Sequence, residues 1–212
     1  KIISENKNIG LEHRSNGKKK LMNVEIKLNS QGFRNNVDID HSKKKILMLG
    51  DSITLGWGTQ NTFSYNLEKL LNNNIQVLNA GIGNTNTYMQ IYNFFQNYSK
   101  YDFDMIVLNF FVNDFEKIII KKTNFFIENF YSIGYFKSKV LKILIKYSLV
   151  DNYENFYLKT FQDENFVQES LSLIKKINEY CKKEKIIFII NYLPELRGMK
   201  NYKFNKQIEI ME

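Results

Sequence analysis

Three short loops in the sequence carry residue types that suit acyl transfer. A hydroxyl follows one apolar run at Ser52, a glycine-rich turn follows another over residues 79–87, and an amide follows a third at Asn113. A serine hydroxyl can attack an ester carbonyl, while backbone N–H groups and a side-chain amide can stabilise the negative oxygen that forms. Ser52 is therefore the candidate nucleophile. The candidate oxyanion donors are the backbone of Gly83 or Asn84 and the side chain of Asn113.

From residue 45 onward, predicted strands alternate with predicted helices. The strands are 46–49, 75–78, 105–111 and 186–193, and the helices are 63–71, 88–98 and 167–181. In the first of these helices, the expected buried face is Phe63, Leu67, Leu70 and Leu71. This alternation predicts a three-layer α/β/α fold with a mostly parallel, flavodoxin-like sheet. Because parallel strands end at one edge, the Ser52 hydroxyl and the Asn113 side chain should lie within about 6 Å of each other.

Two segments stand outside the alternation. Residues 1–44 are polar, contain one predicted strand over 22–28, and form an N-terminal extension to a domain spanning 45–212. Residues 115–161 are longer than a simple crossover needs and are rich in Phe and Tyr, which predicts a helical insert. The insert either caps the core with its aromatic rings, covers the site as a lid, or lies on a membrane surface.

The composition excludes several classes of protein. A single cysteine among 212 residues rules out a disulfide framework and a zinc site built on several thiolates. No uncharged apolar run approaches the roughly 18 residues needed to cross a bilayer. The net charge is +8, but 27 of the 30 basic residues are lysine, whereas phosphate and base recognition favours arginine. We therefore expect no nucleic-acid partner.

Each loop by itself has another explanation. Ser52 is also a suitable helix cap, and Asn113 with its neighbour Asp114 suits an ordinary turn. The glycine-rich turn lacks the third glycine of a dinucleotide-binding motif, and the chain contains no Gly-Lys-Ser/Thr of a phosphate-binding loop. Thr54 replaces the last glycine of a Gly-x-Ser-x-Gly elbow. The three loops together favour acyl transfer more than any one alone.

In order along the chain, these loops resemble the motifs of the SGNH hydrolases, also called GDSL esterases and lipases. Gly50-Asp51-Ser52 matches the nucleophile block, Asn79–Thr87 the second block, and Val112-Asn113-Asp114 the third, with Phe111 in place of a glycine. The segment Asn29–Arg34 is similar to one found in a subgroup whose members are often exported or membrane-tethered. The resemblance covers about residues 9–194. It places the family's oxyanion glycine at Asn84, which leaves the choice between Gly83 and Asn84 open.

The family's last block, Asp-x-x-His, supplies the base and its orienting acid, and no such block follows the fourth predicted strand. His41 precedes the first strand, so about 16 Å of strand separates it from Ser52. His13 lies in the polar N-terminal segment. Because the chain starts at Lys1 and stops at Glu212 without a helix stop signal, we expect it to be a fragment whose missing block lay further on.

The resemblance implies ester hydrolysis, or transfer of the acyl group, through an acyl-enzyme on Ser52 without any metal or organic cofactor. Expected substrates are carbohydrate or lipid esters, and the complete protein is expected outside the cell or close to a membrane. Without its histidine, the chain itself should be nearly inactive. The alternative hypothesis is a non-catalytic module of the same fold that binds a polysaccharide or a protein partner.

Overall fold

The computed structural model describes residues 2–118, 152–196 and 199–211, together with the single positions 140, 144 and 147. Most of the predicted insert over 115–161 therefore lies outside the described residues, as do most of its aromatic side chains. Its C-terminal part contains α6 (Tyr153–Thr160). No helix in the described part of the chain is long and apolar enough to cross a membrane.

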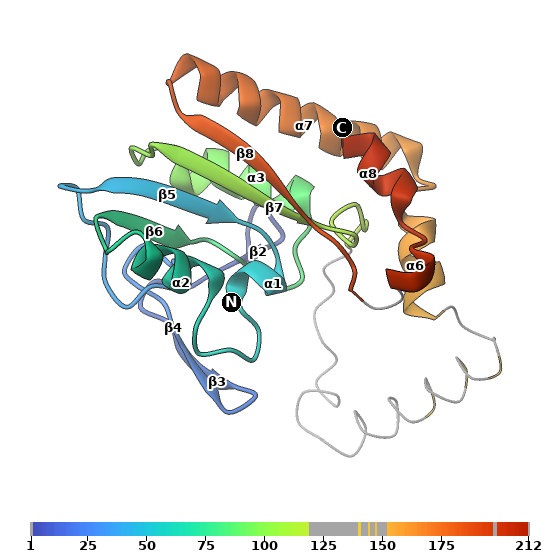
Figure 1. Ribbon diagram of the computed structural model, residues 1–212, viewed down its shortest axis with the longest axis horizontal. Coiled ribbons are helices and arrows are strands. Elements are labelled where there is room, and N and C mark those ends of the chain that lie inside the picture. Colours follow the sequence, from blue (N-terminus) through green and yellow to red (C-terminus); the bar gives the residue numbers. More distant parts are fainter. Residues whose placement is uncertain are drawn as a thin grey trace.

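A parallel four-stranded sheet forms the centre of the molecule (Figure 1). Its strands are β5 (Lys44–Leu49), β6 (Ile75–Asn79), β7 (Met105–Phe111) and β8 (Ile187–Leu193). They lie side by side in the order β6-β5-β7-β8, and every neighbouring pair is parallel. This order confirms the predicted flavodoxin-like α/β fold, with β5, the strand that leads to Ser52, in the interior of the sheet.

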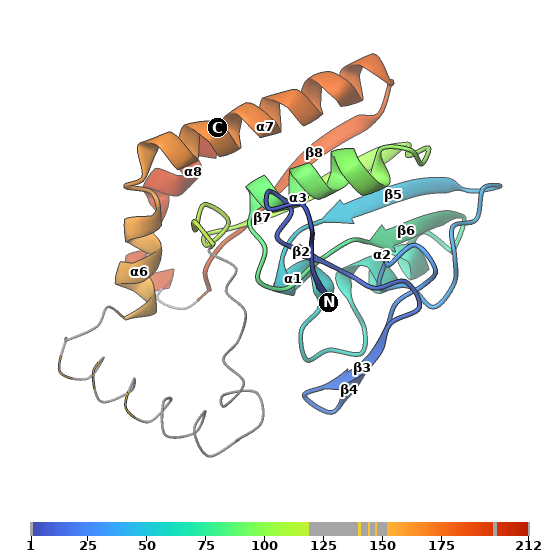
Figure 2. The same cartoon turned by 180° about the vertical axis from the view of Figure 1, so that it is seen from behind.

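Helices cover both faces of the sheet, as Figures 1 and 2 show from opposite sides. On one face, α3 (Thr87–Asn93), the π-helical turn η1 (Phe94–Tyr98) and α7 (Glu164–Lys183) pack on Leu47 and Leu49. On the other face, α2 (Phe63–Leu70) packs on Ile46 and Met48. Successive residues of a strand point to opposite faces, so a continuous apolar run indicates a strand buried on both sides. The predicted three layers are confirmed.

The buried face of α2 differs from the one predicted. Leu67 and Leu71 do pack against the sheet, but Phe63 is 55% exposed and Leu70 is 80% exposed. The helix is rotated so that the small Ser64 faces inward. Residues 64, 67 and 71 share one side of a helix with 3.6 residues per turn, whereas Leu70 points away from Leu71. The prediction counted apolar residues and could not recognise a buried serine.

The N-terminal segment forms two antiparallel strand pairs that are separate from the parallel sheet. One is β1 (Ile2–Ile3) with β2 (Leu11–Glu12), and the other is the hairpin of β3 (Lys18–Leu21) and β4 (Val24–Lys27). The strand predicted over 22–28 is therefore shorter, because Met22 and Asn23 adopt positive φ and make the turn. Further along, Phe33 is fully buried in the main core. At the other end of the described chain lie η2 (Met199–Asn201) and α8 (Asn205–Met211).

Candidate active site

Ser52 is the first residue of the short helix α1 (Ser52–Leu55), which is separated from the end of β5 by two residues, Gly50 and Asp51. The cap of this helix is Asp51, whose carboxyl accepts a hydrogen bond from the Ile53 N–H at 2.8 Å. The capping role considered for Ser52 therefore belongs to its neighbour. The half-buried Ser52 hydroxyl donates to the other oxygen of Asp51 at 3.3 Å.

The second loop brings Gly83 next to Ser52. A Cβ atom placed on Gly83 would lie 3.6 Å from the Cβ of Ser52 and 3.7 Å from the ring of Trp57. Asn84 follows as an exposed residue with φ of 61°, in the left-handed region that asparagine adopts more easily than most residues. Its backbone thus adopts a conformation that glycine usually occupies. Glycine is also the residue that the family resemblance implies at this position.

Buried contacts hold the second loop against α1. The fully buried Asn79 donates from its amide to the Thr54 carbonyl at 2.8 Å, and its oxygen accepts from the Gly81 N–H at 3.0 Å. Gly81 lies so close to the helix that a Cβ there would be 2.2 Å from the Leu55 nitrogen. Only a glycine permits this approach of two backbones, and the approach fixes the position of the loop that carries Gly83.

The third loop contributes Asn113, whose side chain lies close enough to the carboxyl of Asp51 to lower its pKa. The Ser52 hydroxyl and the Asn113 side chain thus both lie near Asp51. The oxygen of Asn113 is buried and accepts no hydrogen bond within the described residues. The structure therefore brings Ser52, Gly83 and Asn113 together at the carboxyl edge of the sheet, with Asn84 next in line.

Two buried carboxyl groups lie beneath this edge. Burial raises the pKa of Asp51, against the opposing effect of its hydrogen bonds. Burial raises the pKa of Asp114 well above its usual range, and repulsion from Asp51 raises it further. Asp114 accepts hydrogen bonds from the Phe111 N–H at 2.6 Å and from the Gln90 amide at 3.0 Å. A carboxyl held this way is neutral more readily than an exposed one.

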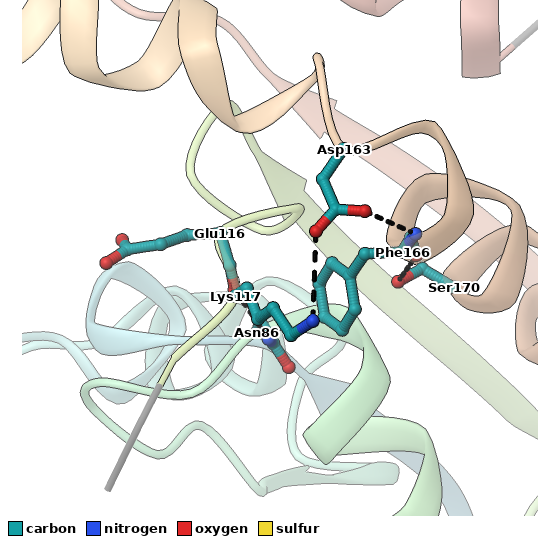
Figure 3. A network of polar contacts seen from close by, with 6 residues as sticks. All are labelled: Asn86, Glu116, Lys117, Asp163, Phe166 and Ser170. Atoms are coloured by element: carbon teal, nitrogen blue, oxygen red, sulfur yellow. Dashed lines mark hydrogen bonds and ion pairs between the residues drawn. The ribbon is translucent and has the colours of Figure 1, made fainter.

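The third loop is anchored to the starts of two helices (Figure 3). Asn86, the cap of α3, donates from its amide to the Glu116 carbonyl at 2.7 Å. Lys117 forms an ion pair with Asp163 at 3.8 Å, and Asp163 caps α7 by accepting from the Phe166 N–H. These contacts tie the residues just after Asn113 to both helices on one face of the sheet.

Arg34 is a positioning residue that the sequence analysis did not identify. Its buried guanidinium donates to the carbonyls of Leu55, Gly56 and Thr59 at 2.5, 2.6 and 2.7 Å. These three carbonyls belong to the last residue of α1 and to the turn that follows it, so a residue of the N-terminal segment fixes the nucleophile loop from outside. The only sequence signal was the similarity of Asn29–Arg34 to a segment of one family subgroup.

The two histidines lie in different places relative to this edge. His41 is exposed and precedes β5, at the amino end of the sheet. It ends the tetrapeptide Asp38-Ile39-Asp40-His41, which has the Asp-x-x-His spacing but stands at the wrong end of the strand for Ser52. The Nδ1 of His13 lies 3.1 Å from the Gly32 carbonyl, and His13 lines a cavity of about 570 Å³ together with Gly83. No cluster of metal-binding side chains is found among the described residues.

Comparisons with known proteins give structural similarity without sequence matches. No protein-family model matches the chain, and no curated protein matches it either. The esterase AlinE4 of the SGNH-hydrolase family is 14% identical with a TM-score of 0.35, over 82% of this chain and 97% of that one. A GDSL-like lipase from Bacteroides thetaiotaomicron is 18% identical with a TM-score of 0.32, over 73% and 71% of the two chains.

A lipase/acylhydrolase from Enterococcus faecalis is similar in the same way, with 13% identity, a TM-score of 0.32, and coverage of 77% of this chain and 82% of that one. Two of these three structures carry SGNH or GDSL in their names, the family whose motifs the sequence resembles. At these TM-scores the overlap of the folds is partial, so a function has to be inferred from the geometry of the site itself.

Proposed function

We propose that this chain is a serine ester hydrolase or acyl transferase of the SGNH type, acting on a carbohydrate or lipid ester through an acyl-enzyme on Ser52. The observation that carries the proposal is the meeting of three loops around one carboxyl group. Ser52 donates to Asp51, the Asn113 side chain lies close to the same carboxyl, and Gly83 lies against Ser52. A nucleophile, a backbone turn and an amide at one point are what acyl transfer requires.

The reaction would proceed in two displacements. The Ser52 Oγ attacks the ester carbonyl carbon and gives up its proton, while the carbonyl oxygen becomes an oxyanion facing the Gly83 or Asn84 N–H and the Asn113 amide. The oxyanion then collapses, and the alcohol leaves with a proton. Water, or a second alcohol in a transfer reaction, attacks the acyl group on Ser52 and regenerates the hydroxyl. Preorganised donors of this kind are worth about 10²–10³ in turnover each.

The proton acceptor limits the rate of this chain. In the structure, the Ser52 hydroxyl donates to Asp51, whose carboxyl also accepts from the Ile53 N–H. A carboxyl that already accepts from a backbone N–H is a poor general base. Loss of a triad histidine can cost on the order of 10⁶ in turnover and leaves about 10³–10⁴ over water. We therefore expect the 212-residue chain to hydrolyse 4-nitrophenyl acetate barely above background.

Rescue by a small base tests the proposal. Free imidazole added to the chain should raise hydrolysis of 4-nitrophenyl acetate above the sum of the imidazole and protein rates, because it can accept the Ser52 proton. Ser52→Ala should lose this excess, whereas Ser172→Ala, which removes an exposed hydroxyl on α7, should keep it. Mass spectrometry should find the acetyl group on Ser52.

The opposite result would reject the enzyme. If imidazole gives no excess rate and no acyl group is trapped on Ser52, the three loops do not form an acyl-transfer site. Binding of a saccharide or protein without any Ser52-dependent chemistry would then support the non-catalytic module.

A further inference from the structure

A cavity of about 570 Å³ lies next to the candidate active site, and the chemistry described so far does not account for its lining. One wall is the hairpin of β3 and β4 with the residues just before and after it. The other wall contains Leu55, Trp57 and Gly83, from the loops that follow β5 and β6. Figure 1 shows the hairpin, in blue, below the sheet and on the same side as α1. The cavity is large enough for a small organic ligand.

A direct contact joins the two walls. The indole N–H of Trp57 donates to the sulfur of Met22, at the tip of the hairpin, at 2.8 Å. A Cβ on Gly58 would lie 3.4 Å from the same sulfur. The hairpin is therefore held against the loop after α1, and the space between them belongs to a formed site.

The polar part of the lining carries positive charge. Arg14, Lys18 and Lys19 all line the cavity, and no acidic side chain is among its described lining residues. Lys18 is paired with Glu25 at 2.9 Å. Arg14 and Lys19 are exposed, and neither forms an ion pair within the described part of the chain. Three cations on one wall attract an anionic group, and the low-dielectric surface beside them strengthens that attraction.

Apart from His13 and two glycines, the rest of the lining is apolar. The apolar residues are Leu21, Ile26, Leu28, Leu55 and Trp57. The indole of Trp57, the only tryptophan of the chain, is 49% exposed. An aromatic face beside cationic groups suits a ligand with both a ring or apolar body and a negative charge. Trp57 also lies against Gly83, which connects the cavity to Ser52.

We propose that this cavity binds the anionic half of the substrate, namely an ester of a sugar ring or of a short-chain acylglycerol that carries a carboxylate, sulfate or phosphate group. The inference rests on the proposed function for the position of the ester bond. Gly83 lines the cavity and lies against Ser52, so a ligand whose charge meets Arg14 and Lys19 can present its ester at the serine. Selection for an acidic substrate follows from the charge, and selection for a ring or short chain follows from the indole.

Fluorescence of Trp57 measures binding without turnover in the full-length Ser52→Ala chain. The first probe pair is a galacturonic acid trimer and the neutral galactose trimer, and the second is hexanoyl glycerol phosphate and hexanoyl glycerol. In at least one pair, the anionic member should bind about tenfold more tightly or better, which corresponds to about 1.4 kcal/mol. The difference should shrink as salt is raised, because exposed charges are screened. The pair that responds distinguishes an acidic saccharide from an anionic lipid.

A matched pair of double variants tests which positive charges cause the preference for the anionic probe. Adding Arg14→Gln and Lys19→Gln should abolish the preference for the anion. Adding Lys182→Gln and Lys183→Gln, which removes the same net charge from the exposed end of α7, should preserve it. Equal binding of anionic and neutral probes, or equal loss in both double variants, would overturn the inference.

The proposed enzyme and the proposed anion-binding cavity can be rejected independently of each other. Anion binding without any Ser52-dependent hydrolysis rejects the enzyme and keeps the site. Imidazole-dependent hydrolysis of neutral esters, with no preference for anions, keeps the enzyme and rejects the site.

Discussion

Gly81 and Gly83 lie two residues apart in one loop, yet their surroundings differ. A Cβ on Gly81 would lie 2.2 Å from the backbone nitrogen of Leu55, where α1 cannot move without disturbing Ser52. A Cβ on Gly83 would meet the side chains of Ser52 and Trp57 at 3.6 and 3.7 Å, which are ordinary contacts. The loop therefore has one position that tolerates no side chain and one that leaves room for a methyl group.

We expect Gly81→Ala to lower the free energy of unfolding by about 1–3 kcal/mol, because one backbone must shift. Gly83→Ala should change it by no more than about 0.5 kcal/mol. Urea unfolding followed by circular dichroism measures both values. Equal destabilisation by the two substitutions would show that Gly81 does not hold the loop against α1.

The ionisation of one residue, Asp114, makes the free energy of unfolding depend on pH. Its pKa is raised well above the ordinary value of 3.8, because it is buried and close to Asp51. As the pH rises above that ordinary value, the unfolded chain releases the proton while the folded chain retains it, so the free energy of unfolding falls. The fall ends once the pH passes the raised pKa of the folded state.

Asp114→Asn should remove part of this fall, because a neutral amide still accepts from the Phe111 N–H and has no proton to lose. Gln90, whose oxygen has no hydrogen-bond partner in the described part of the chain, can turn that oxygen to the new amide. Urea unfolding at about pH 4.5 and about pH 7.5 compares the slopes. Asp102→Asn, at an exposed position, should keep the wild-type slope. An unchanged slope in Asp114→Asn would assign the pH dependence to other groups.

At the scale of elements, the nucleophile helix depends on a segment from outside the parallel sheet. Helix α1 has only four residues, far too few to be stable alone. Arg34 satisfies the carbonyls of Leu55, Gly56 and Thr59 from the N-terminal side. The first 44 residues therefore contribute to the shape of the site, even though they precede its first strand.

Arg34→Met should lower the free energy of unfolding by at least about 2 kcal/mol, because it removes the guanidinium donor from the Leu55 and Thr59 carbonyls and leaves the Gly56 carbonyl only the Thr59 N–H. Arg34→Lys should recover only part of this loss, since one ammonium cannot match the planar guanidinium on three carbonyls. Arg14→Met, at an exposed arginine, should stay within about 0.5 kcal/mol of wild type. Thermal and urea unfolding give the values, and a harmless Arg34→Met would mean that the loop finds other donors.

At the scale of the whole molecule, the positive charge is spread over separate elements. Lysine-rich stretches lie on β3, at the start of β5 and at the end of α7, and only three of the 30 basic residues are arginine. We therefore expect duplex DNA to bind only weakly, with a Kd above about 1 µM at physiological salt. Fluorescence anisotropy over a salt series measures this. Sub-micromolar binding with a steep salt slope would show that the lysines form a nucleic-acid surface.

The strands of the parallel sheet and the three loops that meet at its edge could be predicted from the sequence alone. Strand runs such as residues 46–49 are apolar on both faces, and each is followed directly by its polar loop. Because parallel strands end at one edge, the meeting of Ser52, Gly83 and Asn113 could be predicted from their positions in the chain. This part of the site is local, since each residue lies a few positions after a strand.

The side chains that surround this edge come from packing between distant segments. Arg34 reaches a loop more than twenty residues away, and the hairpin of β3 and β4 closes a cavity against Trp57. Such contacts follow no helix or strand period, so no pattern in the sequence indicates them. The orientation of α2, which buries Ser64, also depends on packing between distant segments. Periodicity tells which elements form, whereas packing between distant segments decides which face is buried and how charge is placed near the serine.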